Sequence, residues 1–194
     1  MILARKELVA AWKNHRIRFS PNIVEKQIGL SSIDIRLGTT FTKLKDRPGV
    51  VIQPARTFDP TDHVEIEDVT KSTGFTSGGP LFRLGPGQFR LAWTYEEVTL
   101  PNDIAANVQG KSGLARAGLA VHITAPHIHP GFSGPITLEL YNHGPWTLEF
   151  VPGEDRICQL IFYKVTSKVN AEAVRALSTY SRPASPYPKK GTPK

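Results

Sequence analysis

The chain has 194 residues, a formal net charge of +7 and a sequence pI of about 9.6. This length suits one domain with a substantial core. The sequence contains no run of about 18 apolar residues, the length that a membrane-spanning helix needs. Charge begins at Arg5, too early for the apolar stretch of a signal peptide, and Cys158, the only cysteine, cannot form an intramolecular disulfide. We therefore expect a cytoplasmic protein with no membrane partner.

The positive charge is concentrated near the C-terminus. Seven Lys and Arg residues and one acidic residue lie between Lys164 and Lys194, a net charge of +6, so residues 1–163 carry +1. A nucleic-acid-binding domain more often spreads basic residues over a folded face, with aromatic side chains among them. We expect no nucleic-acid partner, and a tail that is either solvated or closes over phosphate groups.

The first predicted element is an amphipathic helix over Leu3–His15, where apolar residues recur at helical spacing. Short apolar or alternating runs separated by Gly, Pro and Asn then predict strands. These runs are Ser32–Leu37, Gly49–Ile52, Phe89–Trp93, Val121–Thr124, Ile136–Tyr141, Thr147–Val151 and Ile157–Val165. Sixteen Gly and sixteen Pro spread along the chain favour a mainly β sandwich, barrel or jelly roll, with one interior helix within Gly110–Leu119.

Two segments differ from this pattern. Asp68–Pro80 is small and polar, which predicts an exposed loop or hairpin insertion. Ser178–Lys194 is rich in proline and has no apolar periodicity, so we expect either a disordered end or a flap. The predicted organisation is one domain over residues 1–177, followed by a C-terminal lid or tail over residues 178–194.

A carboxylate lies in the middle of one predicted strand. Within Ile136–Asn142, alternation places Thr137, Glu139 and Tyr141 on one polar face and the aliphatic residues on the other. Glu139 is then either an ordinary solvent-facing residue or, given the turn described next, a proton shuttle.

That turn consists of small residues and precedes the strand. Lys111, Ser112 and Gly113 offer a cation, a hydroxyl and backbone N–H groups to a polyphosphate, and Arg116 adds a fixed positive charge. The turn is not a P-loop, because Gly110 and Lys111 are not preceded by the glycine and spacer of that motif. It indicates a nucleotide site of another type.

Three histidines raise the question of a metal. His122, His127 and His129 are spaced so that their imidazoles could converge. His122 lies in an apolar run and is better interpreted as a hydrogen-bonded, half-buried residue, whereas His127 and His129 flank Ile128 before a Pro-Gly turn and fit a pocket mouth. Because the His-x-Glu and Pro-Cys-x-x-Cys pattern of zinc deaminases is absent, we predict no metal held by the protein itself.

Six blocks of sequence, in order, carry a family resemblance. Ser31–Gly38 contains Ser-Ile-Asp-Ile-Arg-Leu-Gly, and Gly85–Glu96 contains Pro-Gly and ends in Thr-Tyr-Glu, with Pro101 following. The others are the Gly-Lys-Ser-Gly-Leu-Ala-Arg turn, Thr124–Gly134, the Glu139 strand, and Gly153–Leu160 with its Ile-x-Gln-Leu ending. Together they cover most of the chain and resemble the deoxycytidine triphosphate (dCTP) deaminase branch of the dCTP deaminase and dUTPase superfamily.

The resemblance implies a distorted β-barrel or jelly roll of the dUTPase-like type, and a homotrimer whose active sites are shared between subunits. It implies that Glu139 is the acid/base residue, which takes a proton from water attacking C4 of cytosine and passes protons to N3 and the departing amine. Ser112, Arg116 and the carbonyl group of Ala125 correspond to groups that hold the water and the glutamate.

The resemblance also implies a set of substrate contacts. Lys111, Ser112 and Gly113 would contact the triphosphate, and Mg²⁺ would arrive with the nucleotide by bridging its oxygens, without any zinc. The other implied substrate-binding residues are His127, Ile128, His129, Gln159, Tyr180, Tyr187 and Lys190. The last three belong to a Tyr- and Lys-containing C-terminal lid.

The chain departs from the family pattern at several of these positions. Lys111 stands where the family usually has Arg, so the positive charge is kept but the two-pronged hydrogen bonding of a guanidinium is lost. Gly113 replaces a second Ser, which makes the turn more similar to that of dUTPases. His129 replaces an Asp, which counts against efficient dUTP hydrolysis and leaves the sugar 3′-hydroxyl to an imidazole. His127 replaces an Arg, and Pro186 replaces a Lys of the lid.

We therefore expect zinc-independent deamination of dCTP to dUTP and ammonia, a step of pyrimidine deoxynucleotide supply. One alternative is a dUTPase or a bifunctional enzyme that converts dCTP into dUMP and pyrophosphate, which Gly113 favours and His129 opposes. The other alternative is a non-catalytic trimeric nucleotide-binding protein, because several pocket positions depart from the pattern together.

Overall fold

The computed structural model describes residues 1–44, 48–49, 64–68, 75–76, 79–170 and 172–174. Its elements, in chain order, are α1 (Arg5–Lys13), β1 (Arg18–Ser20), the 3₁₀ helix η1 (Glu25–Gln27), β2 (Ile33–Leu44), β3 (Val64–Asp68), β4 (Phe75–Thr76), β5 (Gly79–Pro80), β6 (Phe82–Leu84), β7 (Phe89–Thr99), β8 (Ile104–Gly110), α2 (Ser112–Arg116), β9 (Leu119–Ala120), β10 (His127–Ile128), β11 (Ser133–Asn142), β12 (Leu148–Phe150) and β13 (Arg156–Lys164). The predicted lid, with Tyr180, Tyr187 and Lys190, lies outside the described residues. So do residues 50–52, which make up most of the strand predicted over Gly49–Ile52.

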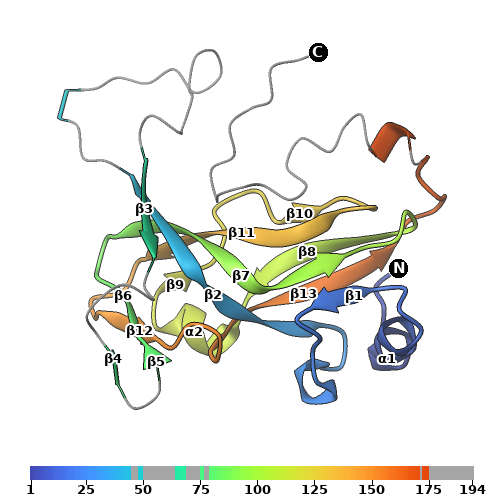
Figure 1. Cartoon of the computed structure of the whole chain (residues 1–194), viewed down its shortest axis with the longest axis horizontal. Helices are drawn as coiled ribbons and strands as arrows, with labels where there is room; N and C mark the ends of the chain where they lie inside the picture. Colours follow the sequence, from blue (N-terminus) through green and yellow to red (C-terminus); the bar gives the residue numbers. More distant parts are fainter. Residues whose placement is uncertain (45–47, 50–63, 69–74, 77–78, 171, 175–194) are drawn as a thin grey trace.

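The N-terminal helix is confirmed, with slightly narrower bounds than predicted. α1 buries Leu8 and Ala11. Immediately before it, the N–H of Leu3 donates to the carbonyl of Phe162 in β13 at 3.0 Å. The helix is therefore fixed to one end of the sheet, beside β1 and β13 (Figure 1).

Most strands form one curved sheet (Figure 1). Their order is β10-β8-β13-β2-β7-β11-β9, with β1 also paired to β7 and β3 to β2. The curve is made by β2, whose first part pairs with β13 and whose second part pairs with β7 and β3. This mainly β, curled architecture confirms the predicted distorted barrel or jelly roll.

Two features of the sequence permit the bend. A Cβ on Gly38 would lie 2.7 Å from the carbonyl oxygen of Trp93, so only glycine allows this approach of β2 to β7. The fully buried carboxylate of Glu96 accepts hydrogen bonds from Arg36 Nε at 2.7 Å, from Arg36 N–H at 2.9 Å and from Gln27 Nε2 at 3.1 Å. The ion pair joins the Ser31–Gly38 block to the Gly85–Glu96 block. It lies where β2 changes its pairing partner from β13 to β7.

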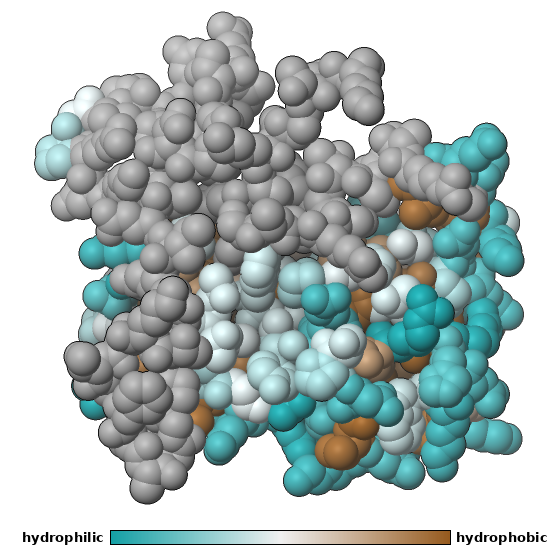
Figure 2. Space-filling model, in the orientation of Figure 1, coloured by the Kyte–Doolittle hydropathy of each residue, from teal (hydrophilic) through white to brown (hydrophobic). Residues whose placement is uncertain are grey.

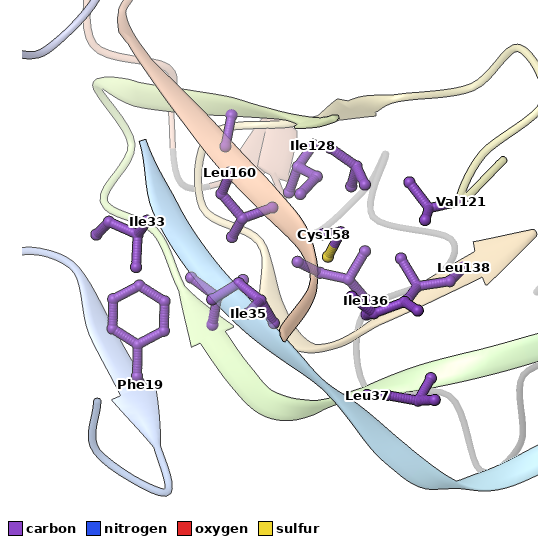
Figure 3. Packing of buried hydrophobic residues seen from close by; sticks show 14 of the residues in the cluster. Phe19, Ile33, Ile35, Leu37, Val121, Ile128, Ile136, Leu138, Cys158 and Leu160 are labelled. Carbon is purple, nitrogen blue, oxygen red and sulfur yellow. The ribbon is translucent and has the colours of Figure 1, made fainter. Parts of the chain in front are cut away.

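The hydrophobic core lies inside the curve, where alternate residues of β2, β11 and β13 meet. Figure 3 shows this packing for Ile33, Ile35, Leu37, Ile136, Leu138, Cys158 and Leu160. Burial raises the pKa of the Cys158 thiol, and the charges of Glu96 and Asp34 add to the rise. The thiol is therefore held neutral as part of the packing.

In the coloured part of Figure 2 the surface is mainly hydrophilic or of intermediate hydropathy, and apolar residues form small, separate patches. No helix in the described ranges is long and apolar enough to cross a membrane.

One prediction about local structure needs correction, and two others are confirmed in more detail. Val121–Thr124 is irregular rather than a strand, because its backbone groups bond singly to Glu139 instead of forming a ladder. The interior helix predicted within Gly110–Leu119 is confirmed as α2, and Gly118 at φ 95° follows its end. For Asp68–Pro80 the sequence predicted an exposed loop or a hairpin insertion. Its described residues include the end of β3 and the antiparallel pair of β4 and β5, which agrees with the hairpin alternative.

Candidate active site

Glu139 lies on the polar face of β11, as alternation predicted. Its Oε2 accepts a hydrogen bond from the N–H of Ile123 at 2.8 Å, and its own N–H donates to the carbonyl of Val121 at 3.0 Å. The side chain is half-buried, and its Oε1 has no hydrogen-bond partner in the described part of the chain. A carboxylate fixed through one oxygen, with the other available, can accept a proton from a bound water.

The small-residue turn connects β8 to α2. Gly110 ends the strand, Lys111 is the N-cap residue and Ser112 begins the helix. Ser112, Gly113 and Arg116 are all exposed, and a Cβ on Gly113 would touch no heavy atom within 4 Å. The backbone here is therefore open to a ligand.

Lys111 is engaged in an ion pair. Its Nζ lies 2.5 Å from Oδ2 of Asp34, and Nη1 of Arg156 lies 3.5 Å from the same oxygen. Two cations thus share one carboxylate, which leaves a net positive charge beside α2. The sequence analysis did not identify Asp34 or Arg156 as site residues. Alternation along β2, which buries Ile33 and Ile35 and turns Asp34 to the other face, is a signal that could have indicated Asp34.

Two implied substrate-binding residues make internal contacts. Gln159 Oε1 accepts a hydrogen bond from Ser32 Oγ at 2.8 Å, and its Nε2 donates to the carbonyl of Gly110 at 3.0 Å. Gln159 therefore holds Gly110, the residue that leads into the Lys111–Gly113 turn, against β13. Ile128 is buried in the core, and its backbone pairs with Ala106 of β8.

His127 and His129 lie side by side at the sheet edge. Their ring centroids are 4.7 Å apart with planes at 85°, and His127 Nδ1 is 3.0 Å from Asn107 Oδ1. Loss of water around part of the ring, and then the charge of His129, lower the pKa of His127. His122 differs from its prediction, because its Nδ1 is buried without any hydrogen-bond partner.

The described residues contain no group of three His, Cys, Asp or Glu side chains arranged for a metal ion. A surface cavity of about 280 Å³ lies elsewhere, between α1 and the ends of β8 and β13, and is lined by residues such as Glu7, Arg16, Asp103 and Lys164. None of the predicted site residues lines that cavity.

Within one chain the predicted catalytic residues remain separate. Glu139 contacts the 121–123 segment, whereas Arg116 makes no hydrogen bond or ion pair with any residue in the described ranges. Ser112 and Ala125 are exposed. Among the described residues, no hydrogen bond or ion pair joins Arg116 on α2 to Glu139 on β11.

Comparison with known proteins gives a consistent result. The dCTP deaminase-like family model matches residues 2–165. A protein of Methanosphaera stadtmanae named dCTP deaminase, dUMP-forming, is 40% identical over 166 residues, covering 86% of this chain and 80% of that protein. Proteins of the same name from Dictyoglomus turgidum and Thermobifida fusca are 40% and 39% identical, covering 86% of this chain and 82% and 80% of their own lengths.

A solved structure supports the fold. The 2′-deoxycytidine 5′-triphosphate deaminase from Agrobacterium tumefaciens aligns with a TM-score of 0.62 and 19% identity, covering 91% of this chain and 51% of that one. The chain thus spans about half of that larger protein, which shares its curled β architecture. With the family model spanning residues 2–165 and relatives near 40% identity, this chain belongs to the dCTP deaminase-like family.

Proposed function

We propose that this protein deaminates dCTP hydrolytically and then hydrolyses the triphosphate, so that its products are dUMP, pyrophosphate and ammonia. The sequence alone favoured dUTP as the product. The dUMP-forming names of relatives at about 40% identity support the bifunctional alternative instead, as does Gly113, whose open position resembles the dUTPase turn.

The observation that carries the proposal is the state of the Glu139 carboxylate. Oε2 is fixed by the N–H of Ile123 at 2.8 Å, while Oε1 has no partner among the described residues. In the proposed step Oε1 takes a proton from water as the water oxygen bonds to C4 of cytosine, and the carboxyl group passes this proton to N3. The carboxylate then takes the proton of the new hydroxyl group on C4 and delivers it to the amino group, so that the C4–N bond breaks and ammonia leaves as the carbonyl forms. No zinc is required, because the glutamate activates the water.

The triphosphate would bind at the turn before α2. Lys111, Ser112 and Gly113 offer it a cation, a hydroxyl and open backbone N–H groups, and Mg²⁺ would enter as the Mg–dCTP complex. Lys111 would exchange Asp34 for phosphate oxygens, with Arg156 remaining on Asp34. The lid residues Tyr180, Tyr187 and Lys190 would then cover the nucleotide.

We further propose that the active site is completed by a second copy of the chain in a homotrimer. Arg116 is exposed and forms no hydrogen bond or ion pair with Glu139 within the described residues of one chain, although the proposal assigns both to the same reaction. Two large apolar side chains in the same region, Ile123 and Trp146, are 57% and 65% exposed. A neighbouring subunit that brings Ser112 and Arg116 to Glu139 would cover such surface.

The direct test is to incubate the protein with dCTP and Mg²⁺ and to separate the products by anion exchange. We expect dUMP, pyrophosphate and ammonia in equal amounts. Accumulation of dUTP would restrict the activity to deamination, and conversion of added dUTP without conversion of dCTP would make the protein a dUTPase. Binding of dCTP with neither product would identify a non-catalytic binder.

Glu139→Gln tests the residue assignment. The amide keeps the shape and the contact to Ile123 but cannot take up the proton, so we expect turnover to fall by about 10²-fold or more while dCTP binding persists. Ammonia release and equilibrium binding of dCTP measure the two properties separately. Normal turnover by this variant would show that Glu139 is not the acid/base residue.

A further inference from the structure

Buried polar atoms without partners gather near Glu139. Among the described residues, three side-chain atoms are buried without any hydrogen bond: Nε1 of Trp93, Oγ1 of Thr42 and Nδ1 of His122. His122 lies between Val121 and Ile123, both of which bond to Glu139. Native proteins usually give buried polar atoms a hydrogen-bond partner. Buried donors or acceptors without one therefore point to a partner, such as a ligand, that binds at this place in the fold.

The sheet register places Trp93 on the same face as the Glu139 carboxylate. Trp93 of β7 lies directly opposite Thr137 of β11, and Leu91 lies opposite Glu139. Directly opposed residues share a face, and diagonal neighbours such as Trp93 and Glu139 are separated by roughly 7–8 Å. Trp93 is partly exposed and its opposed partner Thr137 is exposed, so this face of the two strands is open beside Glu139.

The indole N–H of Trp93 can only donate a hydrogen bond, and tryptophan usually finds an acceptor when this atom is buried. The other two tryptophans of the chain differ from it. Trp12 Nε1 donates to Asn22 Oδ1 at 2.9 Å, and Trp146 is 65% exposed to water. Trp93 is thus the tryptophan of this chain whose donor is both buried and unpaired.

We propose that Trp93 is a specificity-determining residue of the active site, and that its indole N–H donates a hydrogen bond to an acceptor atom of the bound pyrimidine. This inference rests on the proposed function, because it assumes that the base lies above Glu139. In this arrangement the Trp93 ring forms the wall of the base pocket on β7. The opposite wall is the 121–123 segment, which fixes the Glu139 carboxylate. The contact belongs to bound substrate and transition state alike, so its loss should weaken binding rather than the chemical step.

Trp93→Phe removes the donor and keeps an aromatic ring. We expect KM for dCTP to rise by about three- to tenfold, the size of one net hydrogen bond, with kcat nearly unchanged. Trp12→Phe is the matched control, because it also removes an indole N–H but lies in α1, and its KM should equal that of the unmodified protein. A fall in kcat at constant KM, or no change in either, would overturn the proposed contact.

Fluorescence gives a second test that leaves Trp93 in place and so does not depend on how Trp93→Phe folds. In a protein carrying Trp12→Phe and Trp146→Phe, Trp93 is the only source of indole emission. We expect titration with dCTP and Mg²⁺ to change this emission in a saturable way, with a midpoint that matches dCTP binding measured by equilibrium dialysis. Unchanged emission at saturating dCTP would show that Trp93 does not contact the nucleotide.

These outcomes separate the inference from the proposed function. If the unmodified protein converts dCTP but Trp93→Phe behaves like Trp12→Phe and the emission is silent, the function stands and the role of Trp93 is wrong. If dCTP is bound but not converted, the emission change still decides whether Trp93 lines the base pocket.

Discussion

At the scale of single residues, Glu96 is a buried charge with a structural purpose. Its side chain is fully buried and is surrounded by three donors, two of them from Arg36. The guanidinium of Arg36 also donates to the carbonyl of Gly153 at 2.8 Å and stacks 4.5 Å from the ring of Tyr95. These contacts fix the point at which β2 leaves β7 to join β13.

Glu96→Gln should therefore destabilise the protein strongly. The change leaves Arg36 without its counter-ion in a site shielded from water, and breaking a buried ion pair in this way costs about 3–5 kcal/mol. We expect the lower end, about 3 kcal/mol, because Arg36 is 26% exposed and keeps its other contacts. Urea unfolding measures the loss.

The control for this variant is Glu149→Gln, which breaks the exposed pair that Glu149 forms with Arg83 at 2.7 Å. Exposed pairs contribute at most about 1 kcal/mol. Equal losses for the two variants would mean that the bend does not depend on the buried charge.

His127 provides a pH-dependent prediction. Its pKa lies below the ordinary value of 6.5, first because part of the ring loses water and second because of the charge of His129. His129→Asn should raise the pKa of His127 only partly, since the larger cause remains. Titration of the imidazole Cε1–H signals by NMR measures this change; a complete return to 6.5 would show that His129 is the main cause.

The same shift sets a direction for stability. The unfolded chain binds the proton of His127 at a higher pH than the folded chain does, so folding loses stability as pH falls from 6.5 through the lowered pKa. Above pH 6.5 the contribution is constant. Replacement of His127 by Asn should make stability less dependent on pH in this acidic window and leave it unchanged at pH 8.

At the scale of elements, α2 is positioned by contact between two glycines. Gly118 follows the helix at φ 95°, and a Cβ on it would collide with the backbone of Gly144. The N–H of His143 also donates to the carbonyl of Gly118 at 2.8 Å. The loop after β11 therefore determines where Ser112 and Arg116 are presented.

Gly118→Ala should lower stability by at least about 2 kcal/mol, because alanine is strained at this φ and its methyl group has no room. kcat/KM for dCTP should fall as well, since α2 must move. Gly113→Ala is the stability control: its Cβ meets nothing within 4 Å and alanine favours a helix. Thermal unfolding should give an equal or higher Tm for Gly113→Ala; a similarly high Tm for Gly118→Ala would exclude the glycine contact as a determinant.

Sequence pattern predicted elements well where it reflected burial on one face. Glu139 and its neighbours alternate in the sequence and in β11. β8 was not predicted, because Ala105, Ala106 and Asn107 have low β propensity, yet the two alanines are buried and the strand pairs along its whole length with β13. Val121–Thr124 was predicted as a strand from its apolar residues but is irregular. The carbonyl of Val121 and the N–H of Ile123 both bond to Glu139, so they do not form a strand ladder.

At the scale of the whole molecule, contacts between distant segments were beyond sequence reasoning. Family resemblance implies that Lys111 contacts phosphate, but nothing in the sequence indicates its ion pair with Asp34, which joins residues 77 positions apart. The pairing depends on β13 lying between β2 and β8. Similarly, the resemblance implies that Arg116 and Glu139 act in one site, but only the folded chain shows that no hydrogen bond or ion pair joins them within the described residues.

This separation leads to a prediction about the assembly. If each active site takes Glu139 from one subunit and Arg116 from its neighbour, then Glu139→Gln and Arg116→Ala are both inactive alone but complement each other when mixed. In randomly mixed trimers from co-expression, a site is intact when one subunit carries only the Arg116 change and its neighbour only the Glu139 change. About a quarter of sites satisfy this condition, so we expect about a quarter of the normal rate of ammonia release from dCTP.

The control is a chain that carries both changes, co-expressed with the unmodified chain. In that mixture a site is intact only when both contributing subunits are unmodified, which again applies to about a quarter of sites. Activity in this control with none in the complementation mixture would place Glu139 and Arg116 in the same subunit's site. Because the two mixtures contain the same number of altered residues, a difference between them reports which subunit supplies each residue, independently of any effect on trimer stability.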